Sequence, residues 1–351
     1  MVGTDALINS GILGINPAEP ASYSASRQHA DGQPHTGKGP FPRAAGFTQV
    51  VLARELSLNE IRRISEATTV PLEVFVHGAL CVSYSGQCYL SAALSGRSAN
   101  RGECAQYCRL PYTMVDATGT EIVTHKHLLS LKDMNRSDQL EALLDAGVSS
   151  LKIEGRLKDV GYVKNITAYY RKKLDAVLSR RPEYRRASAG RSTYTFEPVA
   201  EKSFNRGFTP FLLEGRTADI TAFNTPKSLG EPVGTVKEIK GNSFTVAGLK
   251  QLNNGDGLVF FNRKGELEGF RVNRVEANRV FPLDMPQLAP RLLFTVISTR
   301  RLINCSPSLQ PNVSCPWRSS SWTSLFTLCM EDETGARIML TEPFAKRAGA
   351  S

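Results

Sequence analysis

Apolar residues in the first half of the chain alternate between strand-like and helix-like spacing. Residues 47–53 (FTQVVLA) and 72–76 (LEVFV) are typical of buried strands, and the apolar residues between them recur at helical spacing. Ser57, followed three residues later by Glu60, predicts a capping box where that helix begins. A strand, a helix and a strand within about 30 residues make a βαβ unit, which implies a parallel sheet.

The same alternation continues to residue 182. The spacing predicts a helix over 137–146 that ends at Gly147, then a strand over 148–153 and a long helix over 159–180. Repeated β/α units are typical of a TIM-like barrel or of an open, doubly wound sheet. Because only about three strands can be counted, residues 44–182 are predicted to form a partial (β/α) TIM-like barrel that does not close.

Residues 230–285 follow a different pattern. Short strand-like runs there are separated by turn dipeptides, namely Gly241-Asn242, Asn254-Gly255 and Lys264-Gly265. This spacing predicts a small antiparallel β domain resembling a barrel. Such a domain could be a nucleic-acid-binding module, or an appendage that only packs on the core.

Three further segments show no sustained period. Residues 1–43 are rich in Gly, Pro, Ser and His, and residues 183–229 connect the two predicted domains. Within 286–351, the stretch 286–330 contains many Pro and Ser residues and no acidic residue. We expect irregular N-terminal and C-terminal segments, at 1–43 and 286–351.

The composition favours a folded protein. Hydrophobic residues make up 41% of the 351 residues, which is enough for a core. No run of eighteen apolar residues is present, and residues 1–20 lack the basic and apolar parts of a signal peptide. We therefore expect no membrane partner and a cytoplasmic location, where the seven cysteines are more often thiols or metal ligands than disulfides.

The formal net charge of +10 suggests an anionic partner. Its distribution weakens that inference, because residues 285–330 carry +4 and residues 21–43 carry +2. The +4 that remains permits RNA binding and fits ordinary surface charge equally well.

Four of the cysteines lie in one segment, with the spacing C-x6-C-x15-C-x3-C. They are Cys81, Cys88, Cys104 and Cys108. Four thiolates can complete a tetrahedral zinc site or hold an iron–sulfur cluster. The wide gaps are not those of a zinc ribbon, and they suit ligands gathered from loops at one end of a sheet. From the residues alone, zinc, an iron–sulfur cluster and plain buried thiols all stay open.

The ends of two predicted strands carry further candidate residues. His77 ends one strand just before the first cysteine, where it could be a general base, a ligand, a substrate contact or a loop anchor. Lys152, Glu154 and Arg156 end the other strand. Lys152 and Glu154 share one strand face and could form an ion pair, and Arg156 could bind an anionic cosubstrate. Because parallel strands end at the same edge, we expect Arg156 and His77 to face the same cavity as the cysteines.

Three separated motifs resemble the U-type, collagenase-like peptidase family, peptidase U32. They are EVFVHGALCVSYSGQCYLS (73–91), RGECAQYCRLPY (101–112) and SLKIEGR (150–156). The KDMN run at 132–135 and the GRLKDVGYVKNITAYY run at 155–170 resemble the branch of this family that forms 5-hydroxycytidine in 23S rRNA. That branch continues well beyond 351 residues, so the chain looks truncated.

The resemblance implies an enzyme that hydroxylates RNA bases, with cytidine C5 in 23S rRNA as the target. It also implies prephenate as a cosubstrate and an iron–sulfur cluster, of the 4Fe-4S type, held by the four cysteines. Asn135 stands where other branches usually have a cysteine, which leaves Cys108 as the fourth ligand. The target base would be flipped or unstacked to react.

Two other functions stay open. The family name suggests a protease, although Ser83 and Ser85 lack His and Asp partners at a recognisable spacing and no H-E-x-x-H motif is present. We predict that the protease interpretation is wrong and that gelatin and casein stay intact. A truncated chain could also be an inactive RNA-binding fragment. The sequence does not indicate the oligomeric state.

Overall fold

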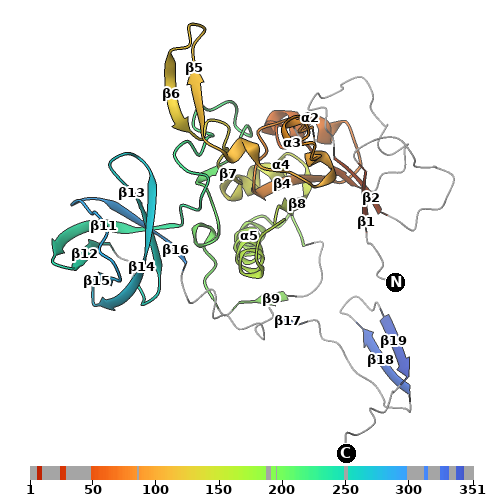
Figure 1. Ribbon diagram of the computed structural model, residues 1–351. Helices are drawn as coiled ribbons and strands as arrows, with labels where there is room; N and C mark the ends of the chain where they lie inside the picture. Colours follow the sequence, from red (N-terminus) through yellow and green to blue (C-terminus); the bar gives the residue numbers. More distant parts are fainter. Residues whose placement is uncertain are drawn as a thin grey trace, which may run out of the picture.

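The computed structural model describes residues 49–84, 87–186, 191–194, 196–248 and 252–298, together with the backbone of several outlying strands. The first part of the chain is an α/β assembly around a seven-stranded sheet (Figure 1). The strands of this sheet are β1 (Ala6–Asn9), β2 (Ser24–Gln28), β3 (Gln49–Val51), β4 (Leu72–Gly78), β7 (Asp133–Asn135), β8 (Val148–Ile153) and β10 (Phe208–Thr209).

Strand β4 lies at the centre of the sheet. It pairs in parallel with β8 along most of its length, from Leu72 to His77. Two strands pair with the other edge of β4. β3 pairs in parallel with the first residues of β4, and β7 pairs antiparallel with His77 and Gly78. The predicted parallel βαβ pairing of β3, β4 and β8 is thus confirmed, and the antiparallel β7 was not predicted.

The helices begin and end where local sequence signals place them. They are α2 (Leu58–Glu66), α3 (Leu90–Ser95), α4 (Leu140–Asp145) and α5 (Val160–Arg180), with short 3-10 turns η1 (Ala99–Arg101), η2 (Tyr107–Arg109), η3 (Ser137–Gln139) and η4 (Ala200–Lys202). The predicted capping box of α2 is confirmed, since Glu60 N–H donates to Ser57 Oγ and the Glu60 carboxylate accepts from Ser57 N–H at 2.8 Å. Asp159 caps α5 by accepting from Tyr162 N–H at 2.8 Å.

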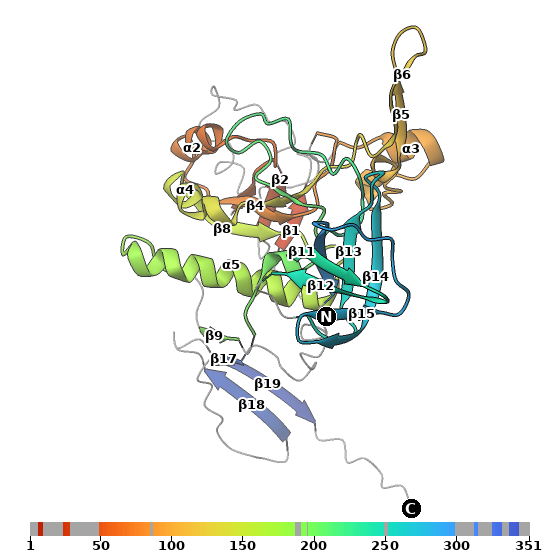
Figure 2. The same ribbon diagram turned by 90° about the vertical axis from the view of Figure 1, so that its left-hand side faces the viewer.

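The main core lies between the sheet and the helices α2, α4 and α5, which Figure 2 shows close to β4 and β8. Side chains alternate along β4, so that Leu72, Val74 and Val76 enter this core, while Phe75 packs on the opposite face with Leu80 and Met134. Both faces of β4 are therefore buried, as is typical of a central parallel strand.

The second part of the chain is a closed antiparallel barrel with the strand order β11-β12-β15-β14-β13-β16. The strands are β11 (Glu231–Lys240), β12 (Ser243–Ala247), β13 (Gly257–Phe261), β14 (Leu267–Glu276), β15 (Arg279–Pro282) and β16 (Leu293–Ser298). Its core contains phenylalanine rings in mutual contact, with centroids 5.1 to 6.3 Å apart. Gly234 lets β11 approach β12 closely, because a Cβ there would lie 2.3 Å from the carbonyl oxygen of Ala247.

Smaller two-stranded sheets complete the described structure. β5 (Tyr112–Val115) and β6 (Glu121–Lys126) form a hairpin that projects from the α/β part in Figure 1. β9 (Arg191–Thr193) pairs with β17 (Asn312–Ser314), and β18 (Leu325–Glu331) pairs with β19 (Arg337–Pro343). None of the helices described is long and apolar enough to span a bilayer.

The structure agrees with the expected fold in its coarse features and differs in its details. A mixed α/β part followed by a small antiparallel barrel is confirmed, but a TIM-like barrel is not, because the sheet does not close within the described residues. The prediction that residues 1–43 are irregular is wrong for β1 and β2, which extend the sheet because β2 pairs with β3 and β1 pairs with β2. The same prediction for residues 286–351 is wrong for β16, which closes the barrel between β11 and β13.

Candidate functional site

The carboxyl ends of β4 and β8 meet at one edge of the sheet. Glu154 N–H donates to the carbonyl oxygen of His77 at 2.8 Å. Gly78 has φ +117°, and a Cβ at this position would lie 2.5 Å from the carbonyl oxygen of Glu154. Only glycine allows the two strand ends to approach this closely before the chain leaves β4 for the cysteine segment.

The four cysteines lie in the irregular segment that follows β4. Cys81 comes three residues after the strand, and Cys88 comes just before α3. Cys104 lies between the two short turns η1 and η2, and Cys108 belongs to η2. All four are free thiols, of which Cys104 is exposed and the others are partly buried.

Hydrogen bonds fasten this segment to itself and to the sheet. Cys88 N–H donates to the Asn100 side chain at 3.0 Å, and Ala105 N–H donates to Ser91 Oγ at 3.0 Å. The Arg109 guanidinium donates to the carbonyl oxygen of Leu80, at 2.8 Å. Arg109 therefore ties the turn that carries Cys108 to the backbone next to Cys81.

The charges of the four thiols are coupled. Burial raises the pKa of the Cys108 thiol, the adjacent guanidinium of Arg109 lowers it, and negative charge on Cys81, Cys104 and Cys88 raises it again. The four sulfur atoms therefore share one electrostatic neighbourhood.

A set of four thiols has the donor chemistry of a zinc site or an iron–sulfur cluster, so the types of residue present fit such a group. Within the described residues, no three His, Cys, Asp or Glu side chains are gathered closely enough to hold a metal ion. Convergence of the four cysteines on one cluster therefore stays a prediction.

His77 lies inside the core. Its side chain is 1% exposed, its Nδ1 lies 3.3 Å from the hydroxyl of Tyr170, and its ring packs against Tyr162, Tyr170 and Phe208. Burial, and then the positive charge of Lys158, lower the pKa of His77 to about 4, so the imidazole is neutral at pH 7. The side chain anchors the strand end in the core. The expectation that His77 faces the same cavity as the cysteines is therefore wrong.

This burial predicts sensitivity to acid. The pKa of His77 is about 4 in the folded chain and 6.5 in the unfolded one, so its contribution to stability is present above pH 6.5 and is lost as the pH falls toward 4. When the pH falls from 7 to 5, the free energy of unfolding of the wild-type protein should decrease by about 2 kcal/mol more than that of His77→Gln. Urea denaturation at both pH values measures this, with the exposed His125→Gln as control. Equal drops in wild-type protein and His77→Gln would contradict it.

Lys152 and Glu154 do not pair with each other, which corrects the ion pair expected from the sequence. Lys152 Nζ lies 2.8 Å from a carboxylate oxygen of Glu73 on β4, and the Glu154 carboxylate lies 3.5 Å from the guanidinium of Arg54. Lys152 therefore pairs across the sheet with a side chain of the neighbouring strand, and Glu154, which follows β8, pairs with a residue of the segment that follows β3. Both residues thus stabilise the sheet at its edge.

Arg156 is exposed and reaches the cysteine segment. Its Nη2 donates to the carbonyl oxygen of Gly102 at 2.6 Å, between Cys88 and Cys104. The loop after β8 is therefore joined to the cysteine segment through this side chain. One of the donors that a bound anion would use is occupied by this backbone contact.

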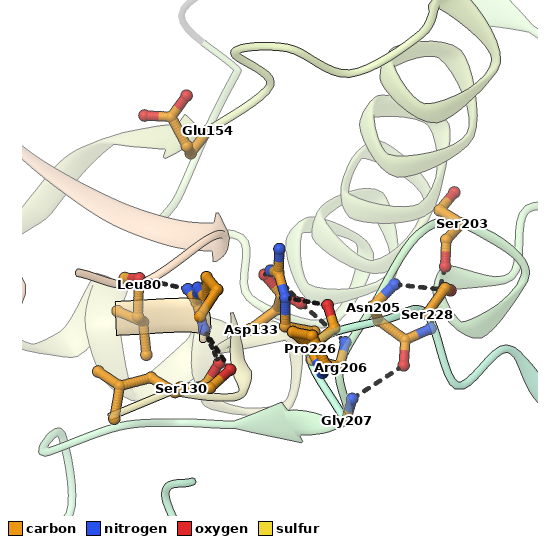
Figure 3. A network of polar contacts seen from close by, with 12 residues as sticks. Leu80, Ser130, Asp133, Glu154, Ser203, Asn205, Arg206, Gly207, Pro226 and Ser228 are labelled. Atoms are coloured by element: carbon orange, nitrogen blue, oxygen red, sulfur yellow. Dashed lines mark hydrogen bonds and ion pairs between the residues drawn. The ribbon is translucent and has the colours of Figure 1, made fainter. Parts of the chain in front are cut away.

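The sequence did not reveal a buried ion pair close to these loops. Asp133 on β7 accepts from Arg206, through the backbone N–H at 2.8 Å and through Nη1 at 3.0 Å. Arg206 Nε also donates to the carbonyl oxygen of Pro226 at 2.8 Å. Figure 3 shows Arg206 between Asp133 and Pro226, with Glu154 apart from this network. The KDMN run contains Asp133, but its partner lies 73 residues further along the chain.

The chain is similar to a known protein family and to several known proteins. The model of peptidase family U32 matches residues 36–222. The chain is 50% identical over 291 residues to the 23S rRNA 5-hydroxycytidine synthase of Escherichia coli, which covers 81% of this chain and 44% of that protein. It is 39% identical over 142 residues to the tRNA hydroxylation protein P1 of Bacillus subtilis, covering 39% of this chain and 34% of that protein.

A third relative has a proteolytic name. The chain is 37% identical over 172 residues to a collagenase of Porphyromonas gingivalis, covering 45% of this chain and 40% of that protein. The chain thus spans less than half the length of each of these three relatives. No solved structure matches it.

Proposed function

The chain belongs to peptidase family U32, and we propose on that basis that it acts in the hydroxylation of RNA bases, converting cytidine to 5-hydroxycytidine in 23S rRNA. The observation that carries the proposal is the 50% identity, over 81% of the chain, to a protein named for that reaction. The tRNA hydroxylation protein among the relatives supports the wider class of reaction. RNA is the proposed partner, and the cytoplasm is the proposed location.

In this proposal the four cysteines hold the cofactor. Cys81, Cys88, Cys104 and Cys108 would bind an iron–sulfur cluster, which would supply one-electron chemistry. Prephenate is the proposed cosubstrate. We propose that the open sheet is part of a TIM-like barrel. In such barrels the catalytic residues lie at the carboxyl ends of the strands. The cysteine segment follows that end of β4.

The chain's own residues have definable tasks at this edge. Arg109 fixes the turn of Cys108 by donating to the backbone of Leu80 and Leu131. Arg156 holds the backbone of Gly102 between two of the cysteines. Neutral His77 and the Tyr170 hydroxyl fill the space under the strand ends and exclude water from it. These contacts would keep the thiols in place while a flipped or unstacked base approaches.

The competing function is proteolysis, which the collagenase relative suggests. Within the described residues, Ser83 Oγ contacts Cys81 Sγ at 3.0 Å, and the buried His77 has its Nδ1 toward Tyr170. A serine nucleophile needs a histidine within hydrogen-bond reach, oriented by a third group, and the described residues do not supply one to Ser83. We expect gelatin and casein to stay intact.

Purification without oxygen tests the proposal. We expect a brown protein with broad visible absorption that contains iron and acid-labile sulfide in equal amounts. Incubation of the same sample with gelatin should give no fragments. A colourless protein that contains zinc would contradict the cluster, and gelatin cleavage that disappears in Ser83→Ala would support the protease instead.

A further inference from the structure

Three cations gather beside the cysteine segment with one buried carboxylate among them. They are Lys158, Arg109 and Arg206, and the carboxylate is that of Asp133. Burial lowers the pKa of Lys158, Asp133 raises it, Arg206 and Arg109 lower it, and Asp159 raises it again. The carboxylate of nearby Asp159 accepts from Tyr162 N–H at the start of α5. The group therefore has an excess of positive charge.

The arginines of this group have protein acceptors for their donors. Arg109 donates to Ser130 Oγ and to the carbonyl oxygens of Leu131 and Leu80. Arg206 is bound by Asp133 and by the carbonyl oxygen of Pro226. These guanidinium groups are fixed in place. They provide positive charge to the site, while their hydrogen-bond donors are used by protein acceptors.

Lys158 differs from both arginines. Its ammonium lies 3.6 Å from the centroid of the Phe204 ring and 5.4 Å from that of Tyr162, and it makes no ion pair or hydrogen bond within the described part of the chain. Its side chain is half-buried, so solvent can reach it. Three N–H donors of a lysine ammonium are thus available to a ligand.

Within the described residues, the carboxylates of Asp133 and Asp159 act on this charge only through space, and neither forms an ion pair with it. Arg206 lies over the same ring, with its guanidinium carbon 4.6 Å from the Phe204 centroid. Arg156, two residues before Lys158, donates to the carbonyl oxygen of Gly102, so the loop that carries the ammonium contacts the segment of the proposed cofactor ligands.

We propose that Lys158 binds an oxyanion, either a phosphate of the RNA substrate or a carboxylate of a small acid, next to the cysteine segment. The inference rests on the proposed function for the identity of the substrate. It moves the anion contact expected at Arg156 to Lys158, because Arg156 Nη2 already donates to Gly102. The positive charges of the fixed Arg109 and Arg206 side chains would also attract the anion, and the Phe204 ring would hold the Lys158 ammonium in place.

Binding measurements on three variants test the proposal. Lys158→Met removes the charge, and Lys158→Arg keeps it. Lys172→Met is the matched control, since it changes the net charge equally. Lys172 lies about 18 Å along α5 from the start of that helix and pairs with Glu197 on the surface. The probes are a fluorescent single-stranded RNA that contains cytidine and, separately, malonate as a small dicarboxylate. Thermal unfolding of each variant verifies that it is folded.

We expect Lys158→Met to raise the Kd of at least one probe about tenfold, while Lys158→Arg and Lys172→Met stay near wild-type values. Loss of RNA binding, with a smaller dependence on salt, identifies the phosphate as the ligand. Loss of malonate binding alone identifies a small acid. Unchanged Kd values for both probes would overturn the proposal, as would an equal loss in Lys172→Met. If Lys158→Met does not fold, Lys158→Gln takes its place.

These measurements do not need a cofactor or turnover. A chain without iron or hydroxylation activity still reports whether Lys158 binds an oxyanion, so failure of the proposed function and failure of this inference give different results.

Discussion

Cys108→Ser should abolish the formation of hydroxycytidine and remove most of the bound iron. A serine hydroxyl is a harder and less acidic ligand than a thiol, so it would not replace a thiolate in an iron–sulfur cluster. Cys108 is held by the turn that Arg109 ties to Leu80, so the remaining three thiols cannot easily recruit another donor. The loss should exceed the roughly 10- to 100-fold effect that follows when a residue that only supports a metal ligand is changed.

Iron and sulfide analysis, together with nucleoside mass spectrometry, measures this effect. Cys315→Ser is the control, because it makes the same chemical change at a cysteine outside both the proposed ligand set and the described residues. Normal iron content in Cys108→Ser would remove this residue from the ligand set. Equal losses in both variants would point to general oxidation or instability.

Arg136→Met should destabilise the α/β part by about 3 kcal/mol, because it leaves several buried acceptors unpaired. The Arg136 side chain is 1% exposed, and it donates to the carbonyl oxygens of Arg54 at 2.8 Å, Pro210 at 3.1 Å and Phe75 at 3.2 Å. Burial lowers the pKa of Arg136 to about 10, so the guanidinium is charged at neutral pH. One side chain thus joins β4 to the segments after β3 and β10.

Chemical denaturation monitored by far-UV circular dichroism measures the change. Arg181→Met is the matched control, since its guanidinium pairs with Glu141, Asp145 and Glu183 on the surface, where solvent screens ion pairs. We expect a much smaller loss in the control. If Arg136→Met unfolds at the same denaturant concentration as Arg181→Met, the carbonyl contacts contribute little to stability.

The parts of the fold that local sequence encodes could be predicted. Ser57 and Glu60 cap α2 through contacts three residues apart, and Gly147, with φ +87°, follows α4 at the predicted position. β4 is a buried apolar run, and the apolar residues Val148, Leu151 and Ile153 of β8 pack on the core. The predicted helix over 137–146 is split into η3 and α4, a difference in hydrogen bonding that periodicity does not resolve.

Elements that depend on distant pairing were missed. The hairpin of β5 and β6 is largely exposed on both faces, so hydrophobic alternation does not mark it, although the Asp116 side chain accepts from Thr118 and Thr120 in its turn. β15 contains Pro282, which argues against a strand in sequence, and β16 follows a segment rich in proline. Both strands are specified by their partners in the barrel.

The candidate site shows the same division. Residue type and motif were sufficient to select the cysteines and the strand ends. Contacts between distant residues were not visible, such as Glu73 with Lys152 and Asp133 with Arg206, because they depend on how segments 70 or more residues apart in the sequence are placed. Lys158 was overlooked for a related reason, since its ammonium contacts aromatic rings and pairs with no carboxylate among the described residues, which the sequence does not show.

Hydroxylation of an RNA base is the activity that we propose for this chain. Expression of the chain in a bacterial strain that lacks the 23S rRNA 5-hydroxycytidine synthase, followed by mass spectrometry of nucleosides from purified 23S rRNA, tests this activity. We expect 5-hydroxycytidine to return with the wild-type chain and to stay absent with Cys108→Ser. Absence of the modified nucleoside in cells that contain folded, iron-loaded wild-type chain would contradict it.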